Sequence, residues 1–253
     1  MAYLTNEERT DGFGAQFQSV LWSFLYTELT DKPYVYTDIK HIDLISNCGS
    51  IKDTECENTL EEAIDYMGFN KYYTNSKNIS GNIEILKYTT AYKYIETNME
   101  YVFRSHEFQK YKQFFYNNKI NRFNNDFFNV AIHIRRLGHW ETENNRFMAG
   151  RHDVPNQHFL NIIKMLRAKY NNKKLLFHIY SQGDIIKFQE FISDDIVLHL
   201  NEKILDTFTD LIYADVLVTC RSSFSYLAAL LSNNVIYYLP FWHPPLNHWN
   251  ILN

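Results

Sequence analysis

Short apolar runs and amphipathic stretches alternate along the second half of the chain. The apolar runs are typical of strands covered on both faces, and the stretches between them place apolar residues at helical spacing. The predicted strands are 129–136, 174–181, 195–200, 215–220 and 235–240. The predicted helices are 156–170, 184–191, 202–214 and 223–232. This alternation predicts an α/β fold with a parallel sheet, whose ligands bind at the carboxyl ends of the strands.

The first half of the chain is less regular. An amphipathic helix is predicted over 14–29 and a strand over 33–39, which together begin a second α/β half. The stretch 45–125 is rich in Asn, Tyr and Lys and is predicted to be helical with long loops. A polar run, "NNKINRFNND", suggests a boundary. We therefore expect two Rossmann-like α/β domains, an N-terminal one over 1–125 and a C-terminal one over 126–253.

Composition narrows the class of protein. The 253 residues are 45% hydrophobic and 21% charged, as in ordinary globular proteins, and the net charge of −4 lacks the basic excess of general nucleic-acid binders. The cysteines are Cys48, Cys56 and Cys220, without a CxxC pair, which suits a reducing compartment. There is no apolar leader and no run of about 18 apolar residues. We expect a cytoplasmic protein with no membrane span and no nucleic-acid partner.

A first candidate motif, "HIRR", ends the predicted strand 129–136. It places His133, Arg135 and Arg136 where a strand leaves the sheet. Two guanidinium groups there suit bidentate binding of a phosphate or carboxylate. The competing interpretation is a surface salt-bridge pair.

A second motif, "TCRSSFS", joins a predicted strand to a predicted helix. Its hydroxyls, Ser222 and Ser223, stand at a helix N-terminus, where backbone N–H groups form an anion site. Simple N-capping by serine is the alternative, and taken alone it is the favoured one.

A third motif, "DGFGAQ", opens the first long helix with Gly12, Phe13 and Gly14. Glycines let a backbone approach a ligand closely. The motif lacks the third glycine of a dinucleotide fingerprint.

Together the three motifs resemble those of the GT-B fucosyltransferase clan, which includes the α1,2-, α1,6- and protein O-fucosyltransferases. Members look like "GxGNQ" near the start, "HxRR" or "HxRxG" opening the second domain, and "SSFS" or "SSFT" late in it. The counterparts here are "GFGAQ", "HIRR" and "SSFS", in the same order and at similar separations. Ala15 departs from the usual asparagine, and Leu137-Gly138-His139 departs from the usual Gly-Asp pair.

The resemblance implies an inverting glycosyltransferase with a nucleotide-sugar donor, most simply GDP-fucose, and a glycan or peptide acceptor on the side of the N-terminal domain. Arg135 would neutralise the β-phosphate, flanked by Arg136 and His133. Ser222, Ser223 and the Phe224 amide would hold phosphate oxygens, and Gly12, Phe13 and Gly14 would also line the donor. Asp206 would bind the guanine edge, with Asp210 as the alternative.

The resemblance also places a general base. A glutamate follows the motif histidine by ten residues in the α1,6 branch, and that spacing reaches Glu143, with Glu141 close by. Such enzymes need no metal or cofactor, and no histidine spacing here fits a zinc pattern. A non-catalytic carbohydrate- or partner-binding module and a transferase for another nucleotide sugar remain alternatives.

Aromatic residues near the C-terminus form one more candidate feature. Phe241, Trp242 and Trp249 could stack on a sugar or could pack a terminal segment onto the sheet. Packing is the more common use of such residues, so it is the expectation.

Overall fold

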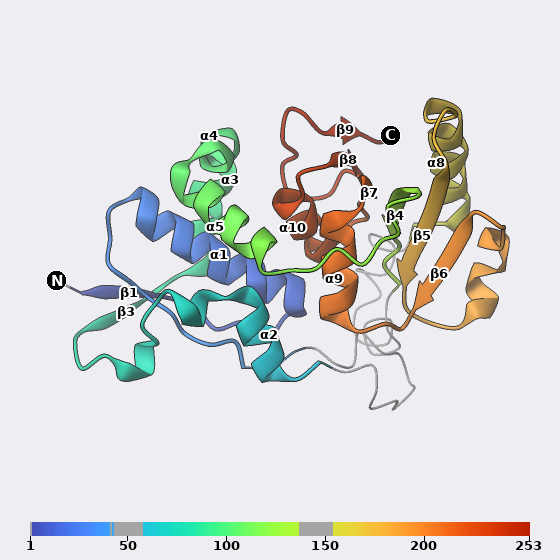
Figure 1. Ribbon diagram of the computed structural model, residues 1–253. Coiled ribbons are helices and arrows are strands. Elements are labelled where there is room, and N and C mark those ends of the chain that lie inside the picture. Colours follow the sequence, from blue (N-terminus) through green and yellow to red (C-terminus); the bar gives the residue numbers. More distant parts are fainter. Residues whose placement is uncertain (1, 41, 43–57, 137–153) are drawn as a thin grey trace. The chain divides into compact units, whose positions relative to one another are not determined.

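The computed structural model describes residues 2–40, 42, 58–136 and 154–253. The described chain divides into two compact units, with the boundary between Lys119 and Ile120. Each unit contains a parallel sheet with helices (Figure 1). The α/β fold with a parallel sheet in the second half is therefore confirmed.

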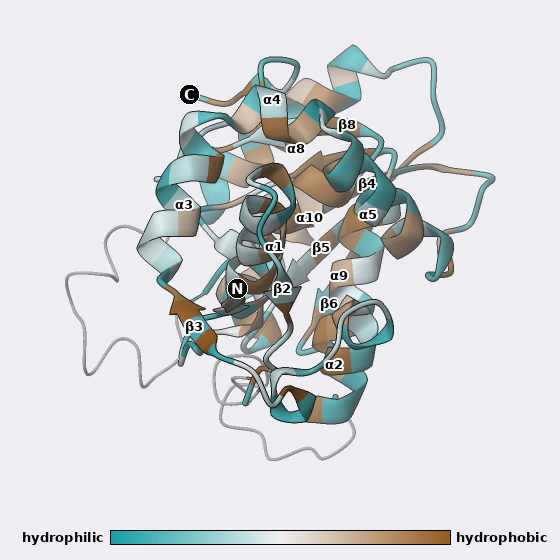
Figure 2. Ribbon diagram, turned by 90° about the vertical axis from the view of Figure 1, so that its left-hand side faces the viewer, coloured by the Kyte–Doolittle hydropathy of each residue, from teal (hydrophilic) through white to brown (hydrophobic). Residues whose placement is uncertain are grey.

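The first unit contains a three-stranded sheet in the order β2-β1-β3, with all pairs parallel. Its strands are β1 (Tyr3–Asn6), β2 (Tyr34–Val35) and β3 (Ile83–Leu86). Apolar β3 forms one edge of this sheet (Figure 2). The short strands β1 and β3 were not predicted from the sequence, whereas β2 lies within the predicted strand 33–39.

Helices make up most of the first unit. The long helix α1 (Phe13–Leu29) is buried along nearly all of its length, and its rings Phe17 and Phe24 both pack on Phe69. The other helices are α2 (Leu60–Met67), α3 (Tyr88–Thr97), α4 (Met99–Arg104) and α5 (His106–Asn117), with the 3-10 turns η2 (Phe69–Lys71) and η3 (Ser76–Asn78). A capping box of Thr59 and Glu62 begins α2.

The second unit is built on a six-stranded parallel sheet in the order β6-β5-β4-β7-β8-β9. The strands are β4 (Phe128–His133), β5 (Leu175–Ser181), β6 (Ile196–Leu200), β7 (Val216–Val218), β8 (Val235–Tyr238) and β9 (Asn250–Ile251). The first strand of this sheet, β4, lies in its middle. β5 and β6 extend the sheet to one edge, and β7, β8 and β9 then extend it from β4 to the other edge. This is the doubly wound order of Rossmann folds, and its topological switch point lies between β4 and β7.

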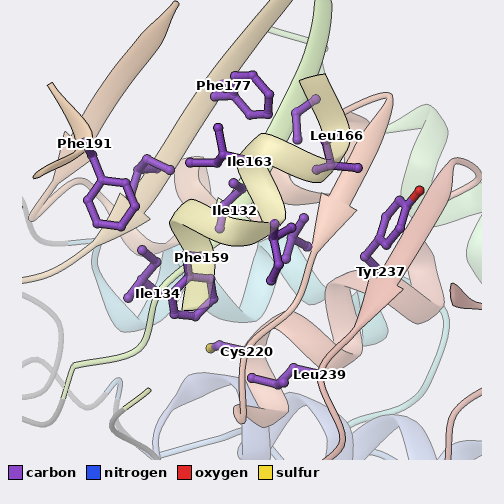
Figure 3. Packing of buried hydrophobic residues seen from close by; sticks show 14 of the residues in the cluster. Ile132, Ile134, Phe159, Ile163, Leu166, Phe177, Phe191, Cys220, Tyr237 and Leu239 are labelled. Carbon is purple, nitrogen blue, oxygen red and sulfur yellow. The ribbon is translucent and has the colours of Figure 1, made fainter. Parts of the chain in front are cut away.

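Successive residues of β4 face opposite sides of this sheet. Val130, Ile132 and Ile134 pack into an apolar cluster with Phe159 and Ile163 of α8 (Asn156–Lys169) (Figure 3). Because side chains alternate along a strand, the odd-numbered residues face the other side. There the covering helices are α9 (Ile204–Tyr213) and α10 (Ser223–Leu231), which pack on each other. The connection from β5 to β6 contains the 3-10 helix η4 (Ile185–Phe191), where a helix was predicted over 184–191, and Asp184 is its N-cap.

Candidate functional site at the switch point

The first two sequence motifs meet at the switch point. His133 ends β4, and the "TCRSSFS" segment follows β7, the strand that pairs with β4 in parallel through Ile132 and Val218. Both motifs therefore leave the sheet at the same carboxyl edge. Open α/β sheets bind their ligands at this position.

Side-chain contacts join the two motifs directly. Nδ1 of His133 lies 3.1 Å from Sγ of Cys220, and the His133 ring lies 5.3 Å from the Phe224 ring. The Arg135 backbone N–H also donates to the Cys220 thiol. In the sequence, Cys220 indicated only a reducing compartment, and its bridging position was not predicted. The feature that could have indicated this position is that Cys220 lies inside the "TCRSSFS" motif, at the end of the predicted strand 215–220.

Both bridging groups are neutral. Burial, aided by the positive charge of Arg135, lowers the pKa of His133 to about 3. Burial raises the pKa of the Cys220 thiol to about 11. His133 therefore contributes a hydrogen-bonding imidazole and not a cation to this edge, which leaves the cationic role to the arginines.

The two adjacent arginines have different surroundings. Nη1 of Arg136 donates to the Val154 carbonyl at 2.9 Å, and its Nη2 donates to Oδ1 of Asn156. The guanidinium also lies 5.7 Å from the centre of the Phe188 ring. Arg136 thus fastens the start of α8 on one side of the sheet. Arg135 lies close enough to His133, on the other side, to lower the pKa of that imidazole. The donor-binding role of both arginines stays a prediction.

Ser222 and Ser223 begin α10 in different ways. Ser222 is buried, and its Oγ accepts a hydrogen bond from the Phe224 N–H at 3.3 Å. It is therefore an N-cap, the alternative that the sequence favoured for this motif alone. Oγ of Ser223 lies 3.0 Å from Nε2 of His243, which sequence analysis did not connect to this turn. Because the Phe224 amide is already engaged by the cap, a phosphate there would compete with Ser222.

The two candidate guanine-binding acids differ in burial and contacts. Asp210 is only 4% exposed. Its carboxylate accepts hydrogen bonds from Nε and Nη2 of Arg122, at 2.9 and 2.6 Å, and from the Tyr180 hydroxyl, at 2.9 Å. Asp206, in the first turn of α9, is half-exposed and lies 3.0 Å from Nη1 of Arg122. Asp206 is therefore the more accessible acid. Arg122 was missed because it lies in the polar run that was interpreted only as a boundary.

A polar network continues from Asp210 across β5 and β6. The Tyr180 ring stacks on His199 at 4.5 Å, and Nδ1 of His199 lies 2.7 Å from a Glu202 oxygen. Nε2 of His199 lies 3.0 Å from Nδ1 of His178, whose pKa burial lowers to about 4. The hydrogen bond from His199 lowers the pKa of Glu202. This network holds the sheet-facing side of α9 in place.

We expect Asp210→Ala to lower the free energy of unfolding by about 1–3 kcal/mol, because the Tyr180 hydroxyl loses its acceptor inside the protein. Urea unfolding measures this loss. Asp206→Ala is the control, since its half-exposed ion pair with Arg122 should contribute less than about 1 kcal/mol. Equal effects of the two substitutions would contradict the structural role of Asp210.

The third motif belongs to the first unit. Gly12 precedes α1 with a φ of −63°, and a Cβ added to it would meet nothing within 4 Å, so the unit itself does not require glycine there. Phe13 and Gly14 are buried in the first turn of α1. Nε2 of Gln16 donates to the Asp11 carbonyl at 2.7 Å and so fixes the turn. The donor-binding role of Gly12, Phe13 and Gly14 stays a prediction.

Part of the predicted site lies outside the described residues. Glu141, Glu143 and the segment Leu137-Gly138-His139 fall in the range 137–153. Within the described ranges, no three His, Cys, Asp or Glu side chains gather as metal ligands would, and metal independence stays a prediction. No helix of the described part has the length and apolar character needed to cross a membrane.

The chain is similar to known proteins in structure but not detectably in sequence. By sequence, the chain matches no family model and no curated protein. It is similar to NodZ α-1,6-fucosyltransferase co-crystallised with GDP, at 12% identity and a TM-score of 0.46, over 91% of this chain and 92% of that one. It is also similar to POFUT1 in complex with GDP-fucose, at 11% identity and a TM-score of 0.45, over 94% and 97% of the two chains.

Proposed function

We propose that the protein is an inverting glycosyltransferase that transfers L-fucose from GDP-fucose to a hydroxyl of a glycan or peptide. The observation that carries this proposal is the meeting of "HIRR" and "TCRSSFS" at the switch point of a doubly wound parallel sheet, through the contact of His133 with Cys220. A cation and a helix N-terminus that converge there suit a diphosphate.

The proposed reaction displaces a diphosphate. The acceptor hydroxyl oxygen attacks the anomeric carbon from the face opposite the diphosphate, and its proton passes to a carboxylate. The bond from the anomeric carbon to the phosphate oxygen breaks, and GDP leaves with both electrons. Arg135 and the N-terminus of α10 stabilise the negative charge that grows on the leaving group. The proposed base is Glu143.

The chemistry and exposure of Asp206 support guanine as the nucleobase of the donor. A carboxylate accepts two hydrogen bonds side by side, and the guanine edge offers two neighbouring N–H donors, whereas uracil offers one. Asp206 is half-exposed in the first turn of α9, whose start lies at the carboxyl edge of the sheet. Asp210 is unsuited to this role because Arg122 and Tyr180 already occupy its oxygens.

We expect GDP to raise the melting temperature more than UDP, ADP or CMP at equal concentration, because only a ligand that binds the native state stabilises it. Thermal-shift measurements followed by calorimetry test this. Asp206→Asn should reduce the preference for GDP over UDP, since an amide presents only one acceptor oxygen. Stabilisation by UDP equal to that by GDP would overturn the donor assignment. GDP-fucose bound without transfer or hydrolysis would indicate a binding module.

A further inference from the structure

Three aromatic residues near the C-terminus divide into two groups. Trp249 is 5% exposed and packs on Tyr226 and Tyr238, with ring centres 5.7 and 5.5 Å apart. Trp242 is 50% exposed, and its ring stacks on Phe241 at 3.8 Å with 28° between the planes. The expectation of packing is therefore correct for Trp249, whereas Trp242 is exposed and stacks on the partly buried Phe241. We call this pair the aromatic platform.

The backbone under the aromatic platform is held firmly. The Phe241 N–H donates to the Tyr238 hydroxyl at 3.2 Å, and that hydroxyl donates to the His243 carbonyl at 2.6 Å. The Tyr226 hydroxyl donates to the Pro244 carbonyl at 2.8 Å. These two tyrosines are buried in α10 and β8, so they tie the segment to the sheet. A preorganised aromatic surface loses little conformational entropy when a ligand binds to it.

The aromatic platform lies next to the phosphate-binding turn proposed above. Its segment leaves β8, the neighbour of β7, at the carboxyl edge of the sheet. His243, which directly follows Trp242, is buried against Tyr226, and its Nε2 lies 3.0 Å from Oγ of Ser223. Ligand-facing residues from β7 and β8 thus belong to one connected group.

The strand order gives the direction in which a donor would extend. Tyr180 of β5 bonds to Asp210 of α9, which places the acids on the β5 side of the switch point. Arg135 follows β4 and Ser222 follows β7, so the diphosphate belongs between them. With guanine at Asp206, the sugar end of the donor would point toward β8. The platform therefore lies toward the sugar end of the donor and not toward the nucleotide end.

We propose that the aromatic platform binds a pyranose ring of a glycan acceptor, which makes a glycan, and not a peptide, the acceptor class. One face of a pyranose ring presents C–H groups that pack on the electron-rich face of an indole. This proposal rests on the proposed function, because the direction of the acceptor follows from the assumed position of the donor.

Glycan binding in the presence of GDP tests the proposal. The full chain is screened with a glycan array, and the strongest oligosaccharide of the array is then titrated by calorimetry. Trp242→Ala should weaken its binding about tenfold or more, whereas Trp242→Phe should retain most of it. GDP affinity should change less than about twofold in both variants, because the platform lies beyond the diphosphate. The matched control is Tyr101→Ala, which removes an exposed aromatic ring from the first unit.

Each other outcome has a defined meaning. A chain that binds GDP but no array glycan, or a Trp242→Ala variant with unchanged glycan binding, would overturn the proposal. Loss of GDP affinity in Trp242→Ala would show that the pair stacks on the nucleobase, which would also overturn it. Glycan binding that depends on Trp242 in a chain without preference for GDP would support the aromatic platform and contradict the proposed donor.

Discussion

Arg135→Ala should bind GDP roughly 30- to 700-fold more weakly than the unaltered protein, a loss of about 2–4 kcal/mol, while GMP binding changes much less. The reason is that the guanidinium is expected to pair with the β-phosphate, which GMP lacks. We propose this role for Arg135, as the motif resemblance implies, whereas Arg136 donates to Val154 and Asn156 at the start of α8. Calorimetric titration with both nucleotides measures the difference.

Two further variants make this result specific. Arg135→Lys should recover little of the affinity, since a point charge does not replace a planar fork of donors. Arg167→Ala removes an arginine of the same unit that pairs with Asp195 on the surface, and it should leave GDP binding unchanged. Equal losses of GDP and GMP affinity in Arg135→Ala would show that Arg135 contacts the nucleobase or stabilises the fold, and does not pair with the β-phosphate.

Glu143→Gln should lower turnover by about 10²- to 10⁴-fold, as loss of a general base typically does. Glutamine keeps the size of the side chain and most of its hydrogen bonding but cannot accept the acceptor proton. GDP affinity should stay nearly unchanged, because the proposed base faces the acceptor and not the diphosphate. Turnover is measured with a screened glycan or peptide acceptor, and GDP affinity is measured in parallel.

The neighbouring acid provides the control for this prediction. Glu141→Gln should have little effect if Glu143 is the base, and the reverse result would exchange the two assignments. Weaker GDP binding in Glu143→Gln would place that residue in the donor site. If neither substitution lowers turnover while Arg135→Ala does, the base lies elsewhere in the chain or on the substrate.

The periodicity of the second half was sufficient to predict its elements from β4 to β8. The strand predicted over 174–181 is Leu175–Ser181, and the helix predicted over 156–170 is Asn156–Lys169. Strands that are covered on both faces appear in the sequence as continuous apolar runs, and helices that pack one face appear as apolar residues at helical spacing. Both patterns are easy to recognise. β9 was missed because a strand of two residues at a sheet edge has no detectable periodicity.

The polar contacts of the candidate site could not be predicted in the same way. Arg122 and Asp210 are 88 residues apart, and only the tertiary fold brings them together. The adjacent Arg135 and Arg136 looked equivalent in the sequence, and they differ in their tertiary contacts: Arg136 donates to Val154 and Asn156, whereas Arg135 lies beside His133. Cys220 and His133 likewise required the pairing of β7 with β4 before their contact could be recognised.

The doubly wound strand order also has a consequence for folding kinetics. β4 and β7 are neighbours, yet the Asn129 N–H at the start of β4 donates to the carboxylate of Asp215, 86 residues later. Such nonlocal pairing is slow, because a long loop must close before its contacts form. The "HIRR" segment is synthesised well before the "TCRSSFS" segment. A nascent chain that ends before β7 therefore carries the "HIRR" motif without the strand that pairs with β4 on the other side of the switch point.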